Sequence, residues 1–155
     1  MEGTLFREIT AQAGPDLLKP IVGRGLAIGD YDNDGRLDVL VVDAEGAPLL
    51  LHNETPAVGN WVQCRLQGTR SNRDGLGALV WVKTEEGKRY LRLCQTDGSY
   101  MSASDKRVHC GVGTAKVVDI EVYWPSGQID VHKQIPTNRI VSLIEGKIRG
   151  EGRLS

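Results

Sequence analysis

The stretch that decides the fold reads Asp30-Tyr31-Asp32-Asn33-Asp34-Gly35-Arg36-Leu37-Asp38, with apolar segments on both sides. Its four carboxylates repel one another, so folding them into one small loop is costly unless a cation joins them. Calcium suits hard oxygen ligands and takes about six to eight of them. We therefore predict a calcium site (Ca2+) whose ligands are the side chains of Asp30, Asp32, Asp34 and Asp38 and the backbone carbonyl of Arg36. Gly35 allows the tight turn.

Two other interpretations compete with a calcium loop between strands. An EF-hand loop also has Asp at its first, third and fifth positions and Gly at its sixth, but its twelfth position is a bidentate Glu. Here that position is Val41, and the flanking segments 25–29 and 37–42 are typical of strands rather than helices. A solvated acidic turn is the simpler alternative and stays open. Such a turn needs Asp and Gly, but it does not need four Asp in register.

The loop also carries a family resemblance. Residues 25–29, GLAIG, followed by DYDNDGRLDVLV, resemble an FG-GAP/VCBS repeat, the blade unit of integrin-type β-propellers. The resemblance implies that the four aspartates occupy the metal positions of that family. The chain contains no second acidic loop, so only one such repeat is expected. Repeat units of this kind need neighbours to bury their faces.

Composition excludes some classes of function. With 155 residues the chain can bury one core, and its net charge of −1 gives no basic footprint for nucleic acid. The longest aliphatic run, 39–42, is far too short for membrane insertion. The amino terminus lacks the basic and apolar regions of a signal peptide. We therefore expect either a cytoplasmic protein or a piece of a longer one whose export signal lies upstream.

Short alternating segments predict an all-β fold, because no segment has a sustained helical period and 19 Gly and six Pro supply the turns. We expect one partial β-propeller blade unit at 1–56, a small antiparallel β sandwich or barrel-like domain at 57–146 and a charged flexible tail at 147–155. Strands are expected at 4–9, 26–29, 37–42, 49–53, 60–67, 78–84, 88–95, 117–124, 128–132 and 139–145, with a helical turn at 16–19 and an irregular segment at 96–113.

A second resemblance covers residues 60–146. Its blocks keep the order found in the ASPIC/UnbV domain, which follows FG-GAP/VCBS repeats in exported proteins. The resemblance implies a secreted or cell-surface protein. The blocks are Asn60-Trp61, 71–78 (SNRDGLGA), 98–102 (GSYMS), 109–113 (HCGVG), 124–127 (WPSG) and 138–146 (NRIVSLIEG).

Two tryptophans of this region receive opposite predictions. Trp124 ends an alternation that also contains Val118, Ile120 and Val122, so we expect it on the core face of its strand. Trp61 has the opposite parity from the apolar residues of its own strand. We expect Trp61 to be less buried than Trp124.

No catalytic residues are predicted. A hydrolase constellation would have to use Ser102, Ser104, Asp105 and His109, but neither serine has the context of a nucleophile elbow. His109 is better explained as a hydrogen-bonded structural residue. The loop 71–77 contains two glycines after a strand, but no helix follows whose amino terminus could hold a phosphate.

The remaining histidines and the cysteines give weak signals. His52 and His132 lack companions at metal-ligand spacing. Cys64, Cys94 and Cys110 are three, so at least one is unpaired within the chain. Cys64 is expected in the core, and a disulfide between two of the three stays open if the protein is exported.

Together these patterns predict a non-catalytic calcium-binding module that serves adhesion or recognition outside the cell or at its surface. Its partner would be a protein or a glycan. Association through open strand edges is also expected, because a lone blade leaves such edges unpaired. The alternative is a hydrolase-like enzyme fragment in which the calcium is structural.

Overall fold

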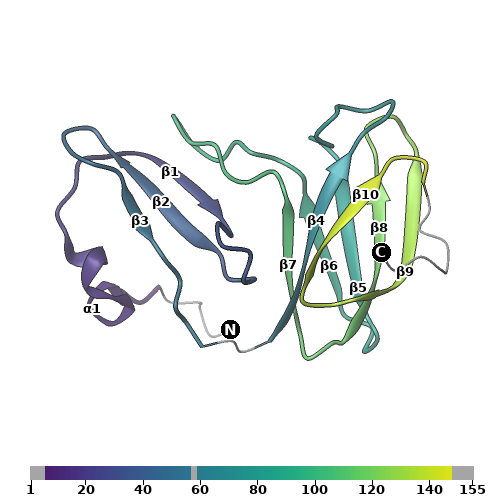
Figure 1. The fold of residues 1–155 in the computed structure, drawn as a ribbon, viewed down its shortest axis with the longest axis horizontal. Coiled ribbons are helices and arrows are strands. Elements are labelled where there is room, and N and C mark those ends of the chain that lie inside the picture. The colour runs from purple at the N-terminus through teal and green to yellow at the C-terminus, as the bar shows by residue number, and fades with distance from the viewer. Residues whose placement is uncertain (1–5, 57–58, 148–155) are drawn as a thin grey trace.

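The protein is described here by a computed structural model, which covers residues 6–56 and 59–147. Strands dominate it, which confirms the predicted all-β class (Figure 1). The elements of the described residues are α1 (Thr10–Ala13), the 3-10 turn η1 (Pro15–Leu18), β1 (Gly23–Gly29), β2 (Asp38–Asp43), β3 (Leu49–Leu51), β4 (Asn60–Gln67), β5 (Leu79–Thr84), β6 (Arg89–Leu93), β7 (Val108–Gly113), β8 (Val117–Tyr123), β9 (Ile129–Pro136) and β10 (Arg139–Ile144).

The first part of the chain forms a three-stranded antiparallel sheet in the order β1-β2-β3. The acidic loop joins β1 to β2, and the strand register pairs Gly29 with Asp38. The two ends of the acidic loop are therefore held next to each other by the ladder itself. In Figure 1 this loop lies at the end of the sheet that faces the rest of the molecule.

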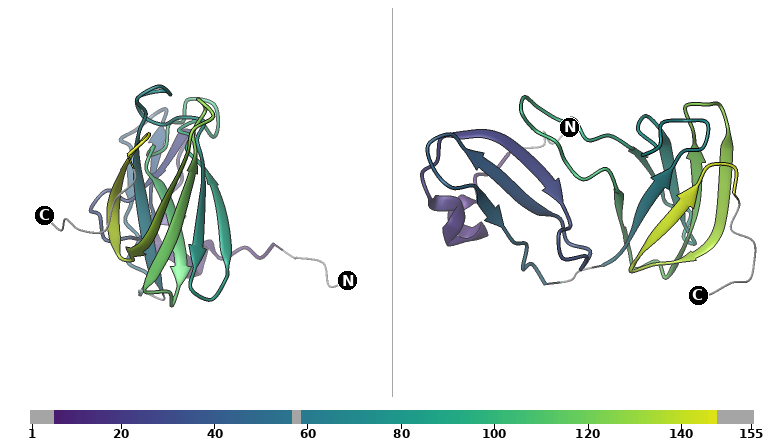
Figure 2. Two further views of the ribbon diagram at one scale, coloured as in Figure 1. Left: turned by 90° about the vertical axis from the view of Figure 1, so that its right-hand side faces the viewer. Right: turned by 45° about the horizontal axis from the view of Figure 1, so that its top comes forward.

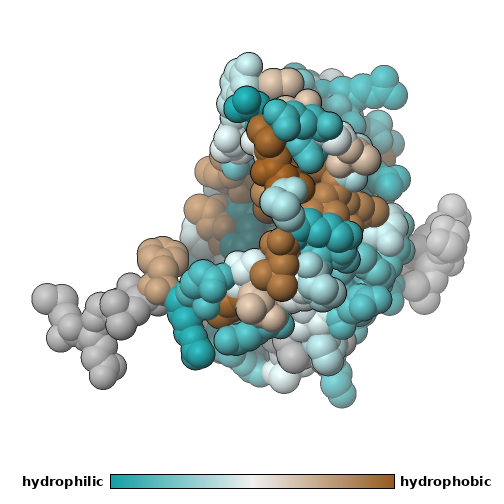
Figure 3. All heavy atoms as spheres, turned by 90° about the vertical axis from the view of Figure 1, so that its left-hand side faces the viewer, coloured by the Kyte–Doolittle hydropathy of each residue, from teal (hydrophilic) through white to brown (hydrophobic). Residues whose placement is uncertain are grey.

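The side chains of this sheet are apolar on both faces and remain partly exposed. Figure 3 shows hydrophobic side chains gathered on the side of the molecule that the first sheet occupies. This sheet has too few neighbours to bury its apolar side chains. A single unit of a repeat architecture has the same property, because it relies on neighbouring units for burial. The exposed apolar residues of the three strands are Leu26, Ile28, Leu40, Val42 and Leu50.

The second part of the chain is a sandwich of two sheets. One sheet has the strand order β10-β4-β7 and the other β6-β5-β8-β9, and the described residues form no closed barrel. β10 runs parallel to β4, which corrects the prediction of a purely antiparallel domain. The parallel pair arises because β9 belongs to the opposite sheet, so the chain crosses over before β10 joins β4.

All residues of the buried apolar core cluster lie between Val62 and Leu143. On β8 the predicted alternation holds, since Val118, Ile120 and Val122 are buried. Trp124 follows them with only 3% of its surface exposed, whereas Trp61 is half-buried. The two predictions for the tryptophans are therefore confirmed.

Several local predictions need correction. Residues 96–113 are not irregular throughout, because β7 occupies their last third; the alternating glycines of that strand hid its pattern. β9 continues to Pro136, beyond the predicted end at 132. Residues 6–9 of the predicted strand 4–9 are not a strand, and residues 4–5 lie outside the described part of the chain. The predicted tail is likewise undescribed from residue 148 onward. The short helix α1 was not predicted.

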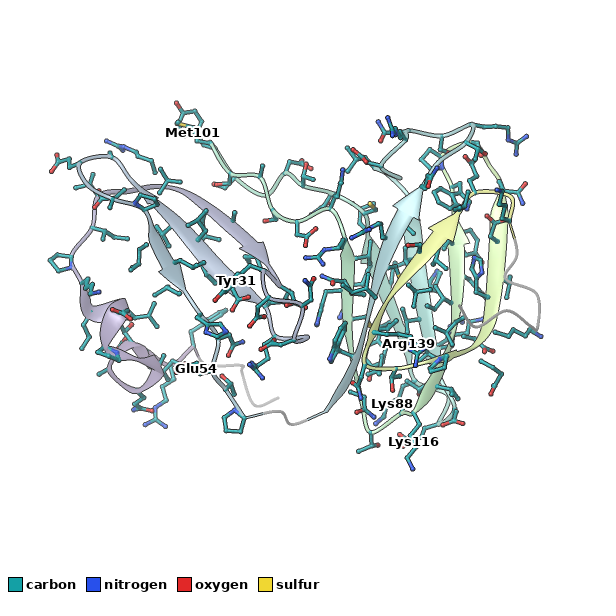
Figure 4. The ribbon with its side chains drawn as sticks, viewed as in Figure 1. Tyr31, Glu54, Lys88, Met101, Lys116 and Arg139 are labelled. Atoms are coloured by element: carbon teal, nitrogen blue, oxygen red, sulfur yellow. The ribbon has the colours of Figure 1, made fainter. Side chains whose placement is uncertain are left out.

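The segment between β6 and β7 leaves the sandwich and extends toward β1 (Figure 2). Met101 lies near its tip (Figure 4). The backbone N–H groups of Leu26 and Ile28 donate to Ser102 Oγ and Ser104 Oγ, at 3.0 and 3.2 Å. The N–H of Asp105 donates to Ile28 O at 2.9 Å. The predicted open edge of the first sheet is thus covered at β1 by the same chain.

Candidate metal centre

The acidic loop is shaped by hydrogen bonds from its own backbone to its carboxylates. Asp30 Oδ1 accepts from the N–H of Asp34, and Asp30 Oδ2 accepts from the N–H of Gly35, both at 3.0 Å. Asn33 and Gly35 have φ angles of 64° and 89°, a region that Asn and Gly enter most easily. The choice of Asn and Gly at these positions therefore follows from the tight path of the loop.

Asp38 closes the loop from the start of β2. Its Oδ2 accepts from the N–H of Tyr31 at 3.1 Å, and its Oδ1 accepts from the N–H of Asn53 at 2.8 Å. The second bond connects the loop to the segment that follows β3. Tyr31 lies in the loop itself, at the end of the first sheet that faces the sandwich (Figure 4).

Three of the predicted ligands converge. Carboxylate oxygens of Asp30, Asp32 and Asp38 all lie within 4.8 Å of one another. Asp30 is fully buried and Asp38 is 3% exposed, and neither carboxylate forms an ion pair with any described residue. A carboxylate offers about four lone-pair sites, so the backbone hydrogen bonds leave acceptor capacity for a cation. The donor set of hard oxygens fits calcium.

Asp34 is placed differently from the other three aspartates. Its Oδ2 pairs with the guanidinium of Arg36, and its Oδ1 accepts from the N–H of Arg36 at 2.8 Å. The guanidinium in turn donates to Asn53 O at 2.5 Å. Arg36 thus neutralises one carboxylate of the loop with its side chain, and the role of its carbonyl as a ligand stays a prediction.

A second possible ligand set was missed in the sequence. Oxygens of Asp32 and Asp34 and a ring nitrogen of His52 lie within 4.8 Å of one another. His52 Nε2 is 3.1 Å from Asp32 Oδ2, and its ring meets the Tyr31 ring edge-on at 5.4 Å. The ligand atoms of His52 and these two aspartates are therefore close enough to one another to share a metal ion, contrary to the prediction that His52 has no such companions. The signal was available, since His52 follows β3, the hairpin partner of β2. A set with an imidazole nitrogen suits transition metals better than calcium.

Side chains of the sandwich also reach the loop, and the sequence did not indicate them. Arg107 Nη2 donates to Asp30 O at 2.7 Å, and His109 Nε2 lies 2.9 Å from Gly35 O. The Trp61 ring stacks on the His109 ring with centroids 6.1 Å apart. A Cβ atom at Gly35 would collide with the Trp61 indole. His109 is thus a hydrogen-bonded structural residue, as predicted.

The residues of the rejected hydrolase constellation have structural partners. Ser102 and Ser104 accept hydrogen bonds from the backbone of β1. Asp105 pairs with Arg107, whose Nε donates to Asp105 Oδ2 at 2.6 Å. None of these contacts pairs a serine hydroxyl with a histidine base, which is the relationship that nucleophilic catalysis requires.

The loop around residues 69–71 holds an anion, although it was not predicted to do so. Glu145 Oε2 accepts from the backbone N–H groups of Thr69, Arg70 and Ser71, at 2.7, 2.7 and 2.9 Å. Burial alone would raise the pKa of Glu145, but these bonds and one from Ser126 Oγ hold it well below its ordinary value. The chain therefore fills this anion site with its own carboxylate.

The three cysteines are buried and free, so the disulfide that the sequence left open does not form. Burial raises the pKa of Cys64 to about 12, with nearby Cys110 and Cys94 adding to the effect. Burial likewise raises the pKa of Cys94 to about 11. No helix of the described residues is both long and apolar enough to cross a membrane.

Comparison with known families assigns more than half of the chain to one family. The sequence profile described as ASPIC and UnbV matches residues 68–150, which are 83 of the 155 residues. The chain belongs to this family. The matched range contains most of the sequence blocks on which the resemblance was based, and it includes β5 to β10.

Curated relatives extend the similarity to the first sheet. Cartilage acidic protein 1 of Mus musculus is 25% identical over 154 residues, covering 91% of this chain and 24% of the relative. The Homo sapiens protein of the same name is 25% identical over 154 residues, with 91% and 23% covered. The Xenopus tropicalis protein is 28% identical over 110 residues, with 69% and 17% covered. The chain thus spans about a quarter or less of the length of these relatives.

Proposed function

We propose that the chain is a calcium-binding, non-catalytic β module that serves adhesion or recognition in a protein outside the cell or at its surface. The observation that carries the calcium proposal is the pair of buried carboxylates, Asp30 and Asp38, which converge with Asp32 and have no cationic partner among the described residues. Like charges held this close, with two of the three carboxylates buried, repel one another, and a bound cation would offset that repulsion.

The proposed role of the ion is structural. A ligand that binds only the folded loop stabilises the fold, and here it would link the end of β1 to the start of β2. Asp30, Asp32 and Asp38 would hold the ion through their carboxylates, with Asp34 and the carbonyl of Arg36 as further candidates. The ion would supply positive charge to the loop and would take no part in a reaction.

We also propose that the first sheet is an FG-GAP/VCBS-type repeat unit, with the boundary to the ASPIC/UnbV domain near residue 56. Two features support this: the acidic loop joins adjacent antiparallel strands, and both faces of the sheet carry partly exposed apolar side chains. A propeller blade has this character because neighbouring blades cover it.

The location and partner are proposed by similarity. The relatives carry the name cartilage acidic protein, which supports an extracellular setting for this chain. The partner would be a protein or a glycan at the cell surface. The outer edge of β3 pairs with no further strand of the described residues and offers backbone groups for association, whereas the edge at β1 is already occupied.

Thermal unfolding of the chain with and without calcium tests this function. Calcium at about one hundred times its dissociation constant adds about 2.7 kcal/mol to the free energy of unfolding, so the midpoint rises. Magnesium, which requires a tighter octahedral site, gives a smaller shift. Thermal unfolding is also measured with zinc, because zinc would bind the ligand set that contains His52. A midpoint that does not respond to calcium contradicts the proposal.

A further inference from the structure

We propose that Arg107 and His109, which belong to the ASPIC/UnbV domain, are positioning residues for the calcium loop of the first sheet. Calcium affinity is then set partly by the sandwich, and calcium binding strengthens the contact between the two units. This inference rests on the proposed calcium function. It goes beyond that function because it assigns part of the metal centre to a unit that supplies no metal ligand.

The guanidinium of Arg107 donates hydrogen bonds to three different residues. Its Nη2 donates to Asp30 O at 2.7 Å, and its Nη1 donates to Asn33 Oδ1 at 2.5 Å. Its Nε donates to Asp105 Oδ2 at 2.6 Å. The N–H of Asp105 itself donates to Ile28 O at 2.9 Å. Arg107 and Asp105 therefore fasten the sandwich to the last residues of β1 and to the first half of the acidic loop.

His109 and Trp61 hold the turn of the loop. His109 Nε2 lies 2.9 Å from Gly35 O, and the Trp61 ring lies against Gly35 so closely that a Cβ atom there would collide with it. His109 and Trp61 lie on adjacent strands, β7 and β4, with their rings stacked. These contacts fix the turn of the loop at the residue directly after Asp34.

The chemistry of these contacts is compatible with a bound cation. Arg107 and His109 bind backbone carbonyls and an amide oxygen of the loop, so they leave the carboxylates of Asp30, Asp32 and Asp38 free for the ion. The charge of Arg107 is balanced by Asp105 at 2.5 Å. The guanidinium can therefore orient the loop without competing for its ligands and with little repulsion of the ion.

By thermodynamic linkage, these contacts predict a measurable coupling between calcium binding and docking of the sandwich on the loop. If the docked sandwich holds the loop in its binding conformation, calcium must in turn favour the docked state by the same factor. Residues that orient metal ligands typically change metal affinity by about 10- to 100-fold when they are removed. An effect of that size on calcium affinity is expected here, from side chains that never touch the ion.

The first test measures calcium affinity by equilibrium dialysis and by terbium luminescence, which Tyr31 or Trp61 would sensitise. Arg107→Gln and His109→Gln are compared with Arg92→Gln, an arginine of β6 that contacts Leu91 O and the Tyr90 ring instead of the loop. We expect Arg107→Gln to weaken calcium binding by about tenfold or more and Arg92→Gln to leave it unchanged. Equal affinity of Arg107→Gln and the parent overturns the inference while leaving the calcium site intact.

The second test needs no variant. Hydrogen exchange of the parent protein is followed across residues 95–108 with calcium and with chelator. Calcium should slow exchange of the Asp105 amide, whereas the β5–β6 turn at 85–87 should not respond. Unchanged exchange at Asp105 in protein that binds calcium overturns the coupling. A parent protein that binds no calcium overturns the proposed function, and this inference with it.

Discussion

The indole of Trp124 donates a hydrogen bond to Asp130 Oδ2 at 2.7 Å, and both side chains are buried. The same carboxylate accepts from the N–H of Gly146 at 2.8 Å and, through Oδ1, from Gln128 Nε2 at 2.9 Å. Trp124 is thus both a core residue and one of three donors to a buried acid. The carboxylate of Asp130 thus connects β9 to the residue that follows β8 and to Gly146.

Trp124→Ala should destabilise the sandwich strongly, because it leaves a large cavity and removes a partner of Asp130. Loss of a core tryptophan costs about 3–5 kcal/mol of unfolding free energy. Trp61→Ala should cost less, since Trp61 is only half-buried. Denaturant unfolding of both variants measures the difference. A Trp124→Ala protein as stable as the parent would show that the core does not depend on this residue.

Gly35→Ala should weaken calcium binding as well as stability. Gly35 has a φ of 89°, and a Cβ atom there meets the Trp61 indole. Gly127→Ala is the matched control, because Gly127 has a φ of 87° and its Cβ would meet nothing within 4 Å. Both substitutions impose backbone strain of about 1 kcal/mol or more, but only Gly35→Ala disturbs the loop. Equal calcium affinities of the two variants would contradict this role of Gly35.

The lowered pKa of Glu145 predicts that the fold loses stability in acid. Its folded pKa lies below the unfolded value of about 4.5, so it stabilises the protein above that pH. This contribution is lost as the pH falls from about 4.5 through the folded pKa. Glu145→Gln should lower the unfolding free energy at neutral pH and flatten its acid slope, measured in chelator. Glu86→Gln, at an exposed pair with Lys88, should do neither. An unchanged acid slope in Glu145→Gln would argue against this account.

Asp32→Ala should abolish the stabilisation by calcium while the sandwich stays folded. Asp32 belongs to both possible ligand sets, and the apolar core lies entirely between Val62 and Leu143. Asp16→Ala, at an exposed pair with Lys19, should retain the full calcium response. Thermal unfolding gives the response, and hydrogen exchange maps the fold. Loss of protection throughout residues 60–145 in Asp32→Ala would show that the two units do not fold separately.

The cysteines should be chemically inert in the native protein. The thiolate is the reactive form, and burial raises the pKa of all three thiols, to about 12 for Cys64 and about 11 for Cys94. A thiol reagent at about pH 8 should label none of them until denaturant is added. Labelling of the native protein at the rate of an exposed cysteine would contradict their burial.

Alternation in the sequence was enough to predict most of the sandwich. On β8, every second residue is large and apolar, and these residues are the buried ones. β7 has the same alternation, but its intervening positions include two glycines, which are poor strand formers, and the strand was missed. The parallel pairing of β10 with β4 could not be predicted, because it depends on a crossover between two sheets rather than on local pattern.

The candidate metal site was predictable only where its residues are close in sequence. Asp30, Asp32 and Asp38 form a local motif, and the structure brings them together. Arg107 and His109 reach the loop from more than 70 residues away, through a docking of two units that no local pattern encodes. The pairing of Asp34 with Arg36 was equally hidden, because spacing does not reveal which oxygen a side chain will face.

Equilibrium dialysis of the parent chain against radioactive calcium tests the central claim most directly. The account predicts saturable binding of about one ion per chain, the occupancy expected of a single acidic loop. It further predicts that Asp32→Ala removes this binding. Retention of no calcium by the parent chain, or equal retention by Asp32→Ala, would contradict the assignment of the loop as a calcium site.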